Sequence, residues 1–102
     1  MDSEKLKHSP ASHKAYMLID SSLGTPDIVR DGIESVLIQA LWYSHNTPCD
    51  FIRDARDWRR VLRWGVAGVE PDYRREYSEM IERDMDLLEE MALSRCGTVV
   101  SN

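Results

Sequence analysis

Three segments of the chain carry the same helix-start signal, and these signals constrain the fold more than any other feature. Each has a cap-capable or acidic residue, then proline, then an acidic residue within the first turn. Proline suits the first helical position because the N–H that it lacks would have had no intrahelical partner there. The acidic residue suits the positive end of the helix dipole. The sequence therefore predicts three substantial helices, which begin at Pro26, Pro48 and Pro71.

Each predicted helix also has a stop signal, which is Asn46, Gly68 or Gly97. The connections that remain are short, and short connections make consecutive helices antiparallel neighbours. We therefore predict an all-α fold, an antiparallel bundle of three long helices. The predicted helices span 26–45, 48–67 and 71–96.

The ends of the chain are less regular than its centre. Residues 1–9 are polar and lack periodicity, which predicts a disordered arm. The segment 11–22 has a short apolar run that fits either a short N-terminal helix or an edge strand, and both alternatives stay open. Residues 98–102 are expected to form a loose tail, so the single helical domain covers 10–97.

Apolar residues recur at three- and four-residue steps in all three predicted helices, which is the spacing of one buried face. In the third helix the steps follow a heptad rhythm, with Ile81 and Leu88 beside it and Asp84 within it. A carboxylate in such a seam is costly unless it is paired, so Asp84 either meets an arginine or lies on the exposed side of a rotated helix. The predicted stripes are Val29, Ile33, Val36, Ala40 and Tyr43; Phe51, Ala55, Trp58, Leu62 and Val66; and Tyr73, Tyr77, Met80, Asp84, Leu87 and Met91.

Composition limits the classes of function. The chain has 102 residues and a net charge of -5, which argues against general affinity for nucleic acid or anionic membranes. Its longest apolar-rich stretch, 36–43, is too short to cross a membrane. Two cysteines, Cys49 and Cys96, do not make a disulfide framework and nothing in the pattern pairs them. We therefore expect reduced thiols and a cytoplasmic location.

The first long helix carries more apolar residues than its core stripe needs. Ile38 and Trp42 lie one turn apart on the far side of the helix, with Leu41 between the two faces. A helix that is apolar nearly all round is normally buried, so one interpretation is a central helix covered on several sides. The other is an exposed patch that docks a protein partner or a second copy, since an aromatic beside aliphatics is typical of interface cores.

The second long helix carries arginines at steps of three, four and three, opposite its core stripe, with Trp64 among them. Interleaved aspartates would neutralise much of this face, which favours a solvated surface. The functional alternative is a rim that orients a protein partner, or a contact with a nucleic acid backbone. The third helix is acidic, so its flank is expected to pair with these arginines. The arginines are Arg53, Arg56, Arg60 and Arg63, with Arg59 at the edge.

Motifs for chemistry are missing from the sequence. There is no nucleophile elbow, no glycine-rich phosphate loop and no set of histidines and cysteines with zinc-ligand spacing. We therefore expect no catalytic residues, no cofactor and no metal site, and a protein that is not an enzyme.

In size, acidity and helical make-up, and in the stretch 37–43, the chain resembles small bacterial antiactivators of LuxR-type quorum-sensing transcription factors. The resemblance implies a cytoplasmic regulator that binds a transcriptional activator and blocks its dimerisation. We expect a homodimer that docks a protein partner through Ile38, Leu41, Trp42, Arg56, Arg60, Arg63 and Trp64. The alternatives are a small DNA-binding regulator that uses the arginine-rich helix, and a structural subunit that self-associates without closure.

Overall fold

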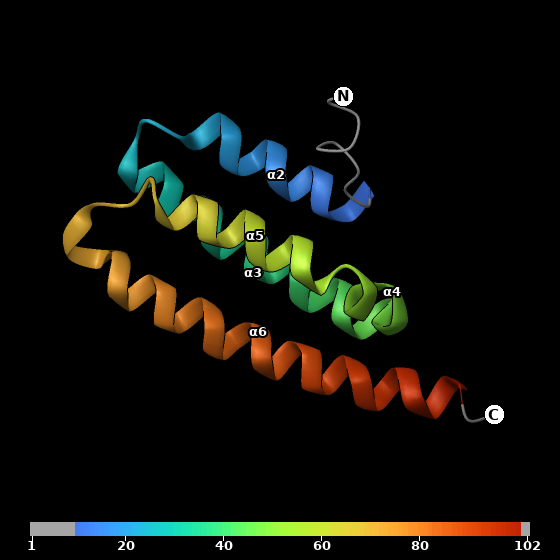
Figure 1. Cartoon of the computed structure of the whole chain (residues 1–102). Helices are drawn as coiled ribbons and strands as arrows, with labels where there is room; N and C mark the ends of the chain where they lie inside the picture. Colours follow the sequence, from blue (N-terminus) through green and yellow to red (C-terminus); the bar gives the residue numbers. More distant parts are fainter. Residues whose placement is uncertain (1–9, 101–102) are drawn as a thin grey trace.

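The structure, a computed structural model, describes residues 10–100, and this part of the chain consists of helices joined by short connections (Figure 1). The predicted all-α class is confirmed, since these residues include no strand. The arm predicted for 1–9 lies outside the described residues, as do 101 and 102. The helices are α2 (Pro10–Ser22), α3 (Pro26–Asn46), α4 (Pro48–Arg53), α5 (Ala55–Val66) and α6 (Pro71–Val100).

The helix starts follow the proline signals. Helices α3, α4 and α6 begin at Pro26, Pro48 and Pro71. Helix α3 ends at Asn46, whose side-chain amide donates a hydrogen bond to the carbonyl of Trp42 at 2.8 Å. Local sequence signals therefore set these boundaries, because a proline start and a side-chain cap need no distant partner. The segment that fitted a helix or an edge strand is a helix, α2.

Two predicted boundaries are wrong. The second long helix is divided at Asp54, which has φ −96° and ψ 5° and separates α4 from α5. Aspartate disfavours helix interiors because its side chain competes for nearby backbone groups. The third long helix does not stop at Gly97 but continues to Val100. Among the described residues the left-handed glycine is Gly24, so Gly97 does not form the αL cap that would end a helix.

The helices form a slab rather than a symmetrical bundle. Helices α3 and α5 pack together at its centre, while α2 and α6 lie on opposite sides of this pair and do not contact each other (Figure 1). Helices α3 and α6 run in the same direction, and α2 and α5 run against them. The Cα atoms extend over 47 × 34 × 17 Å, so the slab is about two helices thick.

The core confirms the stripe of the second long helix, whose five predicted residues are all buried. The heptad stripe predicted for α6 is wrong. Its buried face is Ile81, Met85, Leu88 and Ala92, while Leu87 and Met91 are exposed and Asp84 is half-buried. Helix α6 carries two overlapping apolar stripes, and packing against α3, α4 and α5 selects the one that the heptad count does not.

Glycine allows the central helices to approach closely. A Cβ atom added at Gly65 of α5 would lie 3.2 Å from Ile19 Cδ1 of α2 and 3.2 Å from Ile33 Cγ1 of α3. Gly24, with φ +98°, makes the turn between α2 and α3, a conformation that other residues rarely adopt. None of the helices in the described part is long and apolar enough to cross a membrane.

Candidate protein-docking site

Large apolar side chains on α3 point away from the core. Ile38, Leu41 and Trp42 are 68%, 48% and 55% exposed. Their positions follow from the helical period, because the buried stripe of α3 leaves the opposite side of the helix uncovered. Helix α3 is a central helix that packs against α2, α4, α5 and α6, but within the described structure these neighbours do not cover Ile38, Leu41 and Trp42.

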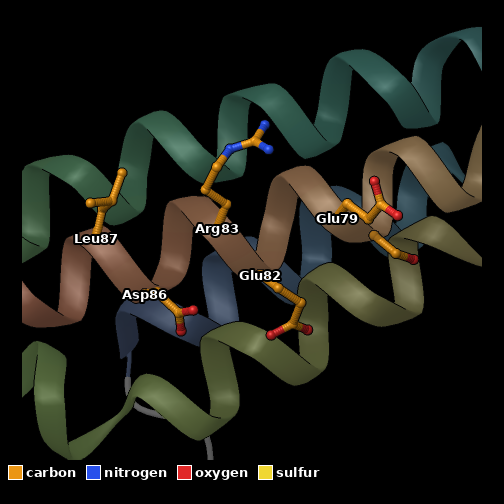
Figure 2. A pocket seen from close by; sticks show the side chains of 6 residues that line it. Glu79, Glu82, Arg83, Asp86 and Leu87 are labelled. Carbon is orange, nitrogen blue, oxygen red and sulfur yellow. The ribbon is translucent and has the colours of Figure 1, made fainter.

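Helix α6 adds a second group of apolar residues beside the first. Leu87 is 52% exposed, and its side chain is directed toward α3 (Figure 2). Met91 lies one turn further along the same side of α6 and is 46% exposed. Helices α3 and α6 are in contact, so the two groups border one surface. We call Ile38, Leu41, Trp42, Leu87 and Met91 the apolar face.

Sequence reasoning found the α3 part of the apolar face but missed Leu87 and Met91. Both belong to the heptad rhythm of α6, and a regular heptad predicts a buried seam. The available signal was the competing stripe that contains Ile81 and Leu88. When one helix carries two apolar stripes, the core can bury only one of them. The other stripe either packs against a different partner or stays exposed.

Charged residues border the apolar face on α6. A shallow hollow of about 680 Å³ runs along this helix. Arg83 projects from its rim toward the same side as Leu87, whereas Glu82 and Asp86 project toward α5 (Figure 2). The rim beside the apolar face is therefore positively charged at Arg83. The hollow is lined by Ser78, Glu79, Glu82, Arg83, Asp86 and Leu87.

The predicted arginine rim is not joined to the apolar face. The arginines lie on α4 and α5, and α5 packs against the opposite side of α3. Most of them are paired: Arg53 with Asp50 at 2.9 Å, Arg60 with Asp57 at 2.5 Å and Arg63 with Glu82 at 2.9 Å. Arg56 is exposed and forms no ion pair with another described residue. This pattern favours the solvated-surface interpretation of the stripe.

Trp64 is not the exposed anchor that the sequence suggested. It is half-buried and packs against the core. Its ring stacks on Tyr16 of α2, with a centroid distance of 4.8 Å and an interplanar angle of 13°. Packing against α2 therefore accounts for Trp64, which is not part of the apolar face.

Arg59 ties α5 to α6 and explains the opposite charges of these helices. Its guanidinium donates hydrogen bonds to Glu89 at 2.6 Å, to Glu82 at 2.5 Å and to Asp86 at 2.7 Å. Burial alone would lower the pKa of Arg59, but these carboxylates raise it above its ordinary value. The hydrogen bond from Arg63, together with the charge of Arg59, holds the pKa of Glu82 below its usual range. The predicted pairing of the two flanks is therefore present in the described structure, chiefly through Arg59.

The expectation of two free thiols is wrong. Cys49 of α4 and Cys96 of α6 form a disulfide that joins positions 47 residues apart. Their spacing in sequence could not show this, because α5 and most of α6 lie between them. Such bonds are typical of oxidising compartments, and in a reducing cytoplasm they are usually bonds that form and break.

The next question is whether the described residues could bind a metal ion. The described residues contain no group of three or more histidine, cysteine, aspartate or glutamate side chains placed to hold a metal ion. Comparison with protein-family models, with curated proteins and with solved structures finds no match to the chain. The apolar face is therefore the feature of the described structure that bears most directly on function.

Proposed function

We propose that the chain is a non-enzymatic regulatory protein that binds a protein partner through the apolar face and occludes the surface that it covers. The observation that carries this proposal is the exposure of Trp42 together with four other large apolar side chains on the contacting helices α3 and α6. Contiguous apolar patches of more than a few hundred Å² are rare on monomeric proteins and mark interaction sites.

The apolar face suits a helix of the partner. Helices α3 and α6 are in contact and run in the same direction (Figure 1), and each exposes large apolar side chains, such as Leu41 on α3 and Leu87 on α6. An amphipathic helix binds such a surface with anchors spaced by three and four residues. Trp42 supplies the large aromatic group that commonly dominates binding energy, and Arg83 supplies a charge at the rim.

The partner class follows from the resemblance to antiactivators of LuxR-type transcription factors. A transcriptional activator that dimerises through helices exposes an apolar helical surface as a monomer, which the apolar face could cover. This partner places the protein in the cytoplasm, where transcription occurs. A homodimer that uses the same face is the competing occupant, and the experiment below separates the two.

The test compares two glutamate substitutions on the same helix. Trp42→Glu places a charge on the apolar face. Ile28→Glu changes a residue of α3 that is 53% exposed but lies near the start of the helix, away from the apolar face. Tagged versions of both variants and of the unchanged chain are used to capture partners from nuclease-treated cells. The mass of each protein alone is measured by sedimentation equilibrium.

We expect the unchanged chain and Ile28→Glu to capture one stoichiometric protein, and Trp42→Glu to lose at least about 30-fold in affinity for it. All three proteins should keep the same helical circular dichroism. If the unchanged chain is a dimer and Trp42→Glu is a monomer, the apolar face binds a second copy of the chain instead of a different protein. Capture of nucleic acid alone, with an affinity that falls steeply with salt, would favour the DNA-binding alternative through α5.

A further inference from the structure

The Cys49–Cys96 disulfide lies at the end of the slab that also carries Trp42. Cys49 is the second residue of α4, which begins two residues after α3 ends. Cys96 lies in the last turns of α6. A second tie occurs beside the bond, where Arg95 Nε donates a hydrogen bond to the backbone carbonyl of His45 at 3.1 Å. Both ties fasten the end of α6 to the region where α3 passes into α4.

Helix α4 depends on this fastening. It has six residues, and a helix this short is not stable by itself in water. Its apolar anchor is Phe51, which is 1% exposed, and it packs mainly against α3 and α6. The covalent bond to Cys96 adds to a small apolar contact, which consists of the buried Phe51 and the half-buried Ile52.

Aromatic rings connect α4 to the apolar face. The ring of Phe51 lies 5.9 Å from that of Trp58, and Trp58 lies 5.7 Å from Tyr43. Tyr43 in turn contacts Trp42 edge-on at 4.9 Å. A displacement of α4 would remove Phe51 from this row of rings and change the packing beneath Trp42.

Both sulfur-bearing residues are half-buried rather than enclosed. Exposed disulfides undergo exchange with a thiolate more readily than enclosed ones. In the reaction a thiolate of a dithiol reductant bonds to one sulfur, and the electron pair of the S–S bond leaves on the other sulfur, which takes up a proton. The second thiol of the reductant then releases the first cysteine, so the protein gains two electrons and two protons and the reductant becomes a disulfide.

We propose that the Cys49–Cys96 bond is a redox-operated latch. A dithiol reductant opens it and releases α4 and the last turns of α6, while the contacts of α2 with α3 and α5 stay in place. The consequence for partner binding, a weaker apolar face in the reduced protein, rests on the proposed function. The opening of the latch itself does not.

The experiment measures amide hydrogen exchange of the full chain with and without dithiothreitol, residue by residue. The informative amides are those of Phe51 and Asp54, which donate to the carbonyls of Thr47 and Asp50 at 2.9 Å and 3.0 Å. The matched control is the double variant Cys49→Ser/Cys96→Ser, which has no bond to reduce. Affinity for the captured partner, measured in both redox states, is a separate readout.

We expect reduction to speed exchange in α4 and at the end of α6 at least tenfold, with α2 and α5 changed by less than twofold. The serine variant should show the exchange rates of the reduced protein, and dithiothreitol should not change them. Unchanged exchange in α4, or an equal acceleration in every helix, would overturn the latch, since the bond would then be inert or a staple of the whole fold. If reduction speeds exchange in α4 but leaves partner affinity unchanged, the disulfide is a redox-operated latch that does not control the apolar face.

Discussion

Replacement of Arg59 by methionine tests whether the network between α5 and α6 stabilises the fold. Methionine keeps much of the apolar stem of Arg59, whose side chain is 17% exposed, and removes all three charged hydrogen bonds. The acceptors differ in exposure: Glu89 is 33% exposed, Glu82 41% and Asp86 74%. Solvent screening therefore weakens the ion pair with Asp86 more than the pairs with Glu82 and Glu89.

The magnitude follows from these exposures. A half-exposed pair contributes roughly 0.5–1 kcal/mol and a well-exposed one a few tenths. Repulsion among the carboxylates left behind adds a similar amount, so we expect a loss of about 2 kcal/mol in the free energy of unfolding at pH 7. For a chain of 102 residues this lowers Tm by about 9 °C.

The effect of the substitution should also depend on pH. In the folded state the pKa of Glu82 is lowered, so its stabilising contribution is complete above its unfolded-state pKa of about 4.3 and is lost as pH falls through the lower folded-state pKa. Near pH 3 the difference between the variant and the unchanged chain should therefore shrink.

The assay is urea unfolding followed by circular dichroism at pH 7 and pH 3, with Arg56→Met as the matched control. Arg56 lies on the same helix, exposed and without an ion pair to another described residue, so its replacement should cost less than about 0.5 kcal/mol. Equal losses for the two variants, or a loss at Arg59 that is undiminished at pH 3, would show that the network does not stabilise the fold.

Two further changes test the packing and the turn. Trp58→Ala removes a side chain that is 1% exposed at the centre of the aromatic row, so chemical unfolding should show a loss of about 3–5 kcal/mol; a loss below about 1 kcal/mol would mean that the core closes over the space. Gly24→Ala places a side chain on a residue with φ +98°, where an added Cβ meets nothing within 4 Å, so the cost comes from backbone strain alone. We expect a loss of about 1 kcal/mol in the free energy of unfolding, measured as a lower Tm. An unchanged Tm would mean that the turn shifts to another conformation.

The parts of the fold that local chemistry decides could be predicted from the sequence. Pro26, Pro48 and Pro71 mark real helix starts because a proline at the first helical position needs nothing from the rest of the chain. The core stripe of α5 was also predictable, since that helix has one apolar side only. The exposed group Ile38, Leu41 and Trp42 appeared as a surplus over the core stripe, although sequence alone left its burial open.

The rest depends on tertiary packing. Helix α6 has two possible apolar sides, and only its contacts with three neighbouring helices decide that Met85 is buried and Leu87 exposed. Trp64 lies on the polar side of its own helix, and its burial needs Tyr16 from α2. The disulfide joins residues whose proximity exists only after the chain has folded back on itself twice. No periodicity within one helix encodes any of these.

The slab is thin enough that its two broad sides have different chemistry. On the side of α3 lies the apolar face, while Arg56 and Arg60 of α5 are exposed on the other side of a slab whose Cα atoms span 17 Å in its thinnest direction. A partner bound to the apolar face would lose an exposed apolar surface, and the complex would present the charged α5 side of this chain to solvent in its place. The chain would then act as a mask that blocks one contact and also makes the complex unattractive to the next apolar surface that it meets.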